Sequence, residues 1–387
     1  MADITLTQVD ADLARLNQYQ LALEGFRRVM EGREVVTGPT AIAMRIALED
    51  ANVDQDEDKG VTGKDIATGF KKVAVTVRNI VQWLLRTIGK LVEKLGLGMQ
   101  KLGARSRKVK EALAAMPEVE RSALGSGEST TLSPEVLQPE MLAIEGKFVG
   151  NDAESLNNVI KIGAWINKDF PKMFDKVMGE TEQLARKHMK DDTSEAFFKA
   201  LSGIIKSGIS KPPVPFSSDN LAPSVMVEGE STNTVPFMGD HGLVLLNPNG
   251  GGVLNDNNPI EMLRGWFIVH FGEFNTKQTG VDEIPVSDYA TITKLSNMIN
   301  SSIEANTDGA NEVRSLMDKR IDTVNSLLDE MAKGGGPGAH GEIAMCIGVM
   351  LQRLTECLTA THGWYGRTLG QELGYLTQCL EQGKQAA

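Results

Sequence analysis

The sequence is poor in the residues that build β-rich cores and covalent frameworks. Aromatic residues make up 5% of its 387 residues, whereas methionine occurs 17 times. This balance favours cores of packed helices over an all-β core. The three cysteines are Cys346, Cys357 and Cys379, and none forms a CxxC pair with another. An odd number of widely spaced cysteines is typical of buried thiols in a reducing compartment, not of a disulfide framework.

Targeting and membrane-spanning segments are also missing. The first residues, MADITLTQVDAD, are acidic where a signal peptide needs basic and then apolar residues. No apolar run approaches the roughly 18 residues that span a bilayer. We therefore expect a soluble protein that is made in a cytoplasm.

Motifs for catalysis, cofactors and metals are absent as well. The segment GVTGKD at 60–65 lacks the strand and the hydroxyl residue of a phosphate-binding P-loop, because Asp65 follows the lysine. No two histidines have a metal-ligand spacing, and no GxSxG motif occurs. We expect no cofactor and no catalytic activity. The alternative of an uncharacterised enzyme would place its site in the region of Asp240, His241 and His270.

Charge is distributed very unevenly along the chain. Residues 1–60 contain 6 Lys/Arg against 12 Asp/Glu, whereas residues 61–110 contain 12 against 2. A block with a net charge of +10 therefore lies within a chain whose overall net charge is −11. Such asymmetry indicates a partner surface or neutralisation within the molecule.

The basic block has the pattern of one long amphipathic helix from Val61 to Leu102. Its apolar residues recur at steps of three and four residues, and the mean step of about 3.6 residues equals one turn of an α-helix. Those that we expect to pack against other helices are Ile66, Val73, Ile80, Leu84, Ile88 and Leu91. The opposite face carries Lys71, Lys72, Arg78, Arg86, Lys90 and Lys94, which we expect to contact a partner. Beyond them, Gly96, Gly98 and Gly103 interrupt the pattern, and a separate short helix is predicted over 108–116.

Three interpretations of this basic face remain open. The helix packs on its neighbours while its charges stay in water, or its charges bind nucleic-acid phosphates or an acidic protein. In the third interpretation the helix lies in a membrane interface, helped by Trp83 and Leu85 at its flank. The large excess of acid elsewhere argues against extended wrapping of nucleic acid but allows one local contact.

The remaining pattern predicts a mainly α fold of the α+β class. Helical N- and C-terminal parts would enclose a small antiparallel β insertion around 216–275, where short β-like runs, Arg264–Phe271 among them, alternate with Gly, Asn and Pro. The expected divisions are a helical N-terminal region 1–116, a linker or processing segment 117–151, a helical body 152–332 and a C-terminal helical hairpin 339–387. Apolar residues at helical spacing are expected to form two stripes, one over 292–303 and a longer one over 313–331.

Several of these segments together resemble one known family. They are the helices LALEGFRRVMEG and IALEDANV, the basic helix VRNIVQWLLRTIGKLVEKL, the linker ending in LAIEGKF, the body with its β insertion, and the C-terminal helix pair. This layout is similar to that of the internal head, or inner-body, proteins of giant tailed bacteriophages. The resemblance implies a non-enzymatic structural protein inside the phage head, made in the host cytoplasm. Its partners would be other head proteins, with packaged DNA on the basic face.

The resemblance also implies proteolytic maturation. Many proteins of that family lose an N-terminal propeptide to the prohead protease, whose preferred sites read small residue–x–Glu. Triplets of this kind end at Glu24, Glu49 and Glu145, of which only the last lies in the expected linker. Cleavage after Glu145 would remove the basic helix and release a more acidic body. Other triplets, among them those ending at Glu128, Glu135, Glu312 and Glu372, match the same pattern, so the pattern alone is not diagnostic.

Overall fold

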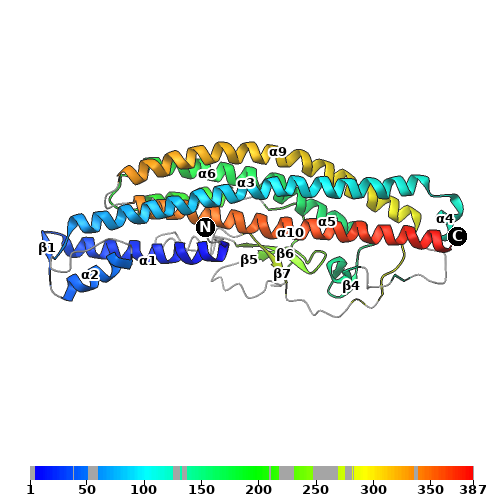
Figure 1. The fold of residues 1–387 in the computed structure, drawn as a ribbon, viewed down its shortest axis with the longest axis horizontal. Helices are drawn as coiled ribbons and strands as arrows, with labels where there is room; N and C mark the ends of the chain where they lie inside the picture. Colours follow the sequence, from blue (N-terminus) through cyan, green and yellow to red (C-terminus); the bar gives the residue numbers. More distant parts are fainter. Residues whose placement is uncertain are drawn as a thin grey trace.

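Three long helices organise the protein into an elongated bundle (Figure 1). The computed structural model describes residues 5–37, 39–50, 60–124, 131–132, 137–208, 211–217, 231–246, 269–274, 281, 283–334 and 339–386. The long helices are α3 (Gly63–Ala115), α9 (Tyr289–Gly334) and α10 (His340–Ala386). At 1.5 Å per residue, each of them runs about 70–80 Å. Segments from both ends of the sequence therefore lie side by side.

Helices α3 and α9 are antiparallel along most of their length. Near one end Arg78 forms an ion pair with Asp329 at 2.7 Å, and further along Ser106 donates to Asn300 at 3.4 Å. The residue numbers rise on one helix as they fall on the other. The basic helix predicted from the sequence is thus a full partner in the bundle.

Helix α10 is one continuous helix, and this corrects the predicted hairpin over 339–387. Its antiparallel partner is α9, since Tyr365 and Ser302 share a hydrogen bond of 2.6 Å, and Tyr375 and Ser287 share one of 2.8 Å. The antiparallel helix pair at the C-terminal end of the chain is therefore formed by α9 and α10. Residues 335–338, which connect these two helices, lie outside the described residues.

Helix α3 continues through the glycines that were expected to end it. Gly96, Gly98 and Gly103 all lie inside α3, and no separate helix begins at 108. Met99 and Leu102 are buried between these glycines, with 1% and 8% of their surface exposed. Packing against α9 and α10 therefore outweighs the low helix propensity of glycine, as tertiary contacts commonly do. The two predicted stripes over 292–303 and 313–331 lie on one helix, α9.

A small N-terminal unit covers one end of the bundle. Thr62 caps the N-terminus of α3. Its backbone N–H and its hydroxyl donate hydrogen bonds to the Asp65 carboxylate at 2.8 and 2.7 Å. The sequence GKD at 63–65 is therefore the first turn of a helix and not a phosphate loop. The elements of this unit are α1 (Leu6–Met30), β1 (Val35–Val36), α2 (Pro39–Asp50) and β2 (Val61–Thr62), and β1 pairs antiparallel with β2.

A second layer of helices packs along α9. It consists of α5 (Ala153–Ala164), the π-helical turn η2 (Trp165–Asp169), α6 (Phe170–His188) and α7 (Glu195–Gly208). Pro171, a residue that normally breaks or kinks a helix, lies in the first turn of α6 directly after the π turn. A π turn accommodates the missing proline N–H without ending the rod.

The predicted β insertion is present as a three-stranded antiparallel sheet. Its strands are β5 (Ser231–Asn233), β6 (His241–Leu246) and β7 (Val269–Glu273), in the order β5–β6–β7. The strand predicted at 264–271 overlaps β7, and its residues 264–268 lie outside the described residues. The mainly α fold with a small antiparallel β part is confirmed.

The segment 117–151, expected to be a linker, is folded wherever the structure describes it. It contains α4 (Glu118–Ala123), the 3-10 turn η1 (Pro139–Leu142) and the two-stranded hairpin β3 (Ala143–Ile144) and β4 (Lys147–Phe148). Leu132, Leu137 and Leu142 are buried, and Phe148 lies edge-on against Tyr375 of α10 at 5.1 Å between ring centroids. Few apolar residues, correctly spaced, suffice to attach this segment to α10.

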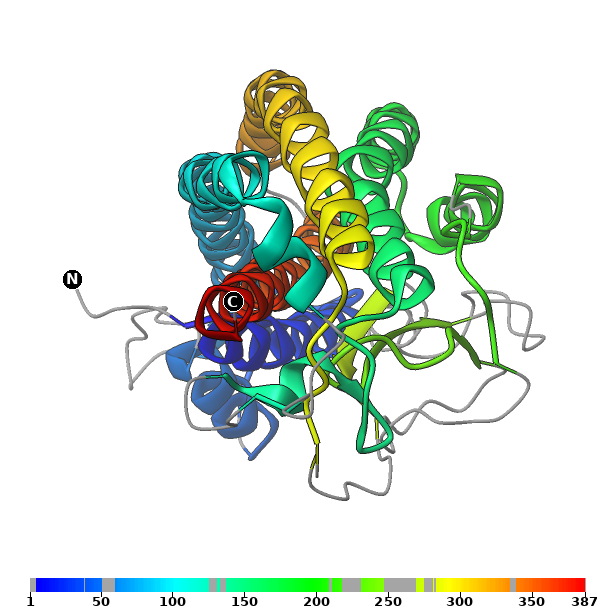
Figure 2. The same ribbon diagram turned by 90° about the vertical axis from the view of Figure 1, so that its right-hand side faces the viewer.

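The described apolar residues form a single core that includes all three long helices. Viewed along the bundle, α10 lies near its centre, with α3 and α9 on one side and α1 and the sheet on the other (Figure 2). By length and composition α10 could cross a membrane, although the sequence analysis found no apolar run long enough to do so. However, 78% of its most apolar window is buried inside the protein. Its apolar character is therefore explained by its central position in the core.

Candidate functional site

The solvent-facing side of α3 carries a row of exposed cations. Of the predicted partner-binding residues, Lys71, Arg86, Lys90 and Lys94 are exposed. None of these four has an ion pair within 4 Å among the described residues, in contrast to Arg78 and its partner Asp329 at 2.7 Å. Arg78 and Lys72 are half-buried. Four of the six predicted residues are therefore available to an external partner.

The opposite face of α3 packs as the periodicity predicted. Ile66, Val73, Leu84 and Ile88 have at most 3% of their surface exposed, whereas Ile80 and Leu91 are half-buried at the edge of the interface. This packing fixes which side of α3 faces water. The basic side chains therefore cannot turn inward without unfolding the helix from α9 and α10.

The structure extends the basic face beyond the residues found from the sequence. Because α3 is continuous, its cations line up at steps of 4, 4, 7, 4 and 3 residues along one side. We call this row the basic stripe, and it consists of Arg86, Lys90, Lys94, Lys101, Arg105 and Lys108. The row covers about 33 Å of helix. Its second half was missed because the glycines were read as a helix end, although the spacing alone could have revealed it.

The flank that suggested a membrane-interface helix is not presented to the outside. Leu85 has 1% of its surface exposed, and Trp83 is partly buried against the core. An interfacial helix needs an apolar face that is free to enter the lipid. Here the apolar face of α3 is occupied by the rest of the bundle.

Asp240 and His241 do not form a catalytic pair. The Asp240 carboxylate accepts a hydrogen bond from the backbone N–H of Glu145 at 2.7 Å, while the His241 ring bonds to the Gly239 carbonyl. Burial lowers the pKa of His241, and its ring packs against both Phe271 and Trp364, which also contact each other.

These contacts attach the sheet and the β3–β4 hairpin to α10. The side chain of His270 lies outside the described residues. Among the described residues no cluster of three or more His, Cys, Asp or Glu could hold a metal ion.

The three predicted cleavage residues lie in different surroundings. Glu24 is inside α1, where it pairs with Arg27 at 3.1 Å and burial raises its pKa. Glu49 is inside α2. Glu145 is exposed and occupies the tight turn of the β3–β4 hairpin, with Glu145 at φ 52° and Gly146 at φ 77°. Only Glu145 is thus outside a helix.

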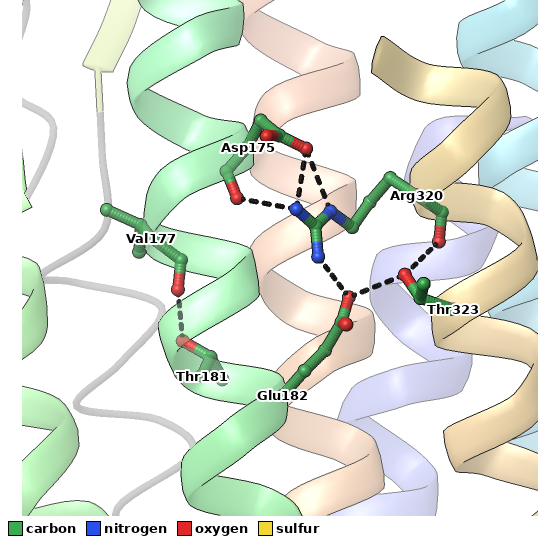
Figure 3. Close-up of polar contacts among 6 residues, drawn as sticks. All are labelled: Asp175, Val177, Thr181, Glu182, Arg320 and Thr323. Atoms are coloured by element: carbon green, nitrogen blue, oxygen red, sulfur yellow. Dashed lines mark hydrogen bonds and ion pairs between the residues drawn. The ribbon is translucent and has the colours of Figure 1, made fainter.

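A buried ion cluster joins α6 to α9 (Figure 3). The Arg320 guanidinium donates to Asp175 Oδ1 at 2.7 and 2.9 Å and to Glu182 Oε1 at 2.9 Å. Burial alone would lower the pKa of Arg320, but these hydrogen bonds outweigh it and raise the pKa. Gly179 makes room, since a Cβ there would lie 3.2 Å from the guanidinium. Because the single guanidinium pairs with both carboxylates of α6, the cluster links α6 to α9.

Comparison with known proteins gives one match. The family model described as phiKZ-like phage internal head proteins matches residues 2–378, almost the whole chain. No curated protein and no solved structure matches the chain.

Proposed function

Because the chain belongs to the phiKZ-like phage internal head proteins, we propose that it is a non-enzymatic component of the head interior that binds packaged DNA through α3. The protein lies inside the phage head in the virion and associates with other head components. Packaged DNA is the most abundant polyanion in that compartment. The basic stripe is the surface that would meet it.

The observation that supports DNA binding is the set of exposed cations on α3 without ion pairs. Arg86, Lys90 and Lys94 project from a helix whose other face is fixed in the core. Fixed cations neutralise phosphates without reading bases, and the displaced counterions supply most of the binding free energy. The overall net charge of −11 keeps the rest of the surface from clinging to DNA, so the contact is local.

Salt-dependent binding to duplex DNA tests this function. The full chain should bind 30-base-pair duplexes of unrelated sequence with similar affinity, measured by fluorescence anisotropy between 50 and 200 mM salt. Replacing Lys71, Arg86, Lys90 and Lys94 by glutamine should reduce the slope of log K against log salt by up to about 4, because each phosphate that is no longer neutralised lowers the slope by about 0.9.

A matched control removes four charges elsewhere. It replaces the exposed Lys168, Lys176, Lys187 and Lys199 of η2, α6 and α7 by glutamine, and it should leave the slope within about 1 of the unmodified chain. Equal losses in both variants, or no binding by the unmodified chain, would contradict the proposal. Co-sedimentation with anionic vesicles that persists at high salt would favour the membrane interpretation instead.

The same proposal includes proteolytic maturation after Glu145. The exposed position of Glu145 outside any helix, in a triplet Ala143–Ile144–Glu145, supports this residue over Glu24 and Glu49. Intact-mass analysis of the protein from mature heads tests it. A species that begins at Gly146 is expected, and a full-length chain in mature heads would overturn this part of the proposal.

A further inference from the structure

The second half of the basic stripe lies beside α10 in a fixed register. Arg105 of α3 donates to the backbone carbonyl of Gly370 at 3.2 Å. A Cβ on Gly370 would also lie 3.8 Å from Leu102, and one on Gly348 would lie 3.5 Å from Val81. The numbering offset between the two helices is thus nearly constant, so α3 and α10 run parallel.

This register brings cations and glycines together along the line between the two helices. One turn before the Arg105–Gly370 contact, Lys101 lies level with Gly366 and Arg367. One further turn back, Gly98 lies level with Gly363. We call this strip the α3–α10 seam, and it comprises Lys94, Gly98, Lys101, Arg105, Gly363, Gly366 and Arg367.

The internal packing of the protein does not require the three glycines of the seam. A Cβ added at Gly98, Gly363 or Gly366 would meet no other atom within 4 Å. Each glycine inside a helix costs roughly 1 kcal/mol relative to alanine. What they provide is open space, in which a partner can approach the backbones of both helices closely.

The cations of the seam are available and partly pre-positioned. Lys94, Lys101 and Arg367 are exposed and have no ion pair among the described residues. The Gly370 carbonyl holds Arg105 across the seam. A phosphate backbone that enters between α3 and α10 would therefore meet cations from both helices.

We propose that the α3–α10 seam seats one phosphate strand of duplex DNA. This inference rests on the proposed function and deepens it, because it assigns the contact to one part of α3 together with α10. Arg105 and Lys101 would contact phosphates from one side of the strand and Arg367 from the other. The glycines would admit the strand between them.

The composition of the seam favours a DNA duplex over other polyanions. Residues 84–115 contain no aromatic side chain, and Trp364 and Tyr365 on the α10 side of the seam are fully buried, so the seam offers no exposed aromatic ring on which the bases of single-stranded nucleic acid could stack. Along the stripe Leu97, at 55% exposure, is the one large exposed apolar side chain among the residues whose exposure the structure describes. A protein interface would need a larger apolar centre.

The first test removes charge from the seam of the full chain. The seam variant Lys94→Gln/Lys101→Gln/Arg367→Gln is compared with the control Lys64→Gln/Arg107→Gln/Lys110→Gln, which removes three exposed cations from the other side of α3. In anisotropy titrations with a 30-base-pair duplex, the seam variant should lose about 3 from the salt slope. The control should lose less than 1.

The second test blocks the seam without changing charge. The substitutions Gly98→Leu and Gly363→Leu fill space that the protein leaves open, so helix content and urea midpoint should be retained or raised. DNA affinity should fall at least about tenfold. Gly89→Leu is the matched control, because a Cβ at Gly89 of α3 also meets no atom within 4 Å but Gly89 lies outside the seam. The DNA affinity of this control variant should equal that of the unmodified chain.

The outcomes separate the two proposals. If the unmodified chain does not bind duplex DNA, both the proposed function and the seam fall. If the chain binds DNA but the seam variants bind as tightly as their controls, the seam is overturned while the proposed function stands. Stronger binding of single-stranded DNA or of anionic vesicles than of duplex would also overturn the seam as a duplex site.

Discussion

Removing the Arg320 side chain should destabilise the bundle more than any change to a surface ion pair. The Arg320 side chain is 12% exposed and holds Asp175 and Glu182, which are 24% and 9% exposed. Its loss leaves two carboxylates in the α6–α9 interface, and among the described residues only Thr323 remains as a donor, to Glu182 at 3.2 Å. Breaking a buried ion pair from one side costs about 3–5 kcal/mol. We expect about 3 kcal/mol for Arg320→Met, because Asp175 keeps partial contact with water.

Urea unfolding followed by circular dichroism measures this loss, and a second variant identifies its cause. The triple change Arg320→Met/Asp175→Leu/Glu182→Met removes the whole cluster and should recover most of the lost stability, since apolar side chains can replace a buried ion cluster at little cost. The control Arg186→Met breaks the exposed pair with Glu330, whose side chains are 40% and 42% exposed. It should cost less than about 1 kcal/mol.

Two results would refute this reasoning. If Arg320→Met costs no more than Arg186→Met, the buried cluster contributes no more than a surface pair. If the triple variant is as unstable as Arg320→Met, the loss arises from removed packing volume and not from carboxylates left without a partner.

Three further predictions concern single positions in the core and at the hairpin. Gly163→Ala should cost about 2 kcal/mol in urea unfolding, because the new Cβ would lie 2.3 Å from the Tyr365 ring, and a Tyr365→Leu background should remove most of that cost. Asp240→Ala should speed cleavage of the native chain after Glu145 by a Glu-specific protease about tenfold, read by mass spectrometry, since the turn loses a hydrogen bond of 2.7 Å. Burial raises the pKa of Glu372 well above its usual 4.5. Stability should therefore fall as pH rises above about 4.5, where the unfolded chain releases this proton first, and Glu372→Gln should reduce the difference in urea midpoint between pH 5 and pH 8.

The sequence predicted the buried faces of helices well because burial follows periodicity. Val73, Leu84 and Ile88 of α3 are buried, as their spacing required. Helix continuity was predicted poorly, since it depends on neighbours that are distant in sequence. The glycines of α3 lie within an unbroken helix because the long helices support one another along their length.

The candidate site was predicted in part for the same reasons. The exposed positions of Lys71, Arg86 and Lys90 follow directly from the helical pattern. The pairing of Arg78 with Asp329 could not be anticipated, because it depends on the antiparallel register of α3 and α9. Arg367 lies more than 250 residues from Lys101 in sequence, and only the parallel packing of α3 and α10 places the two on one strip.

The role of α3 in the core changes what cleavage after Glu145 would accomplish. Residues 1–145 include α3, whose apolar face shares one core with α9 and α10. If the folded chain were cut at this turn, the N-terminal fragment would stay bound, because its separation would expose that core to water. Release of an acidic body therefore requires cleavage before the bundle forms. The hydrogen bond from the Glu145 N–H to Asp240 also favours cleavage before folding, since it restrains the turn once the sheet has docked on α10. A DNA-binding seam that includes α3 persists in the mature head only when cleavage follows folding or does not occur, so the order of the two events decides whether this surface is permanent.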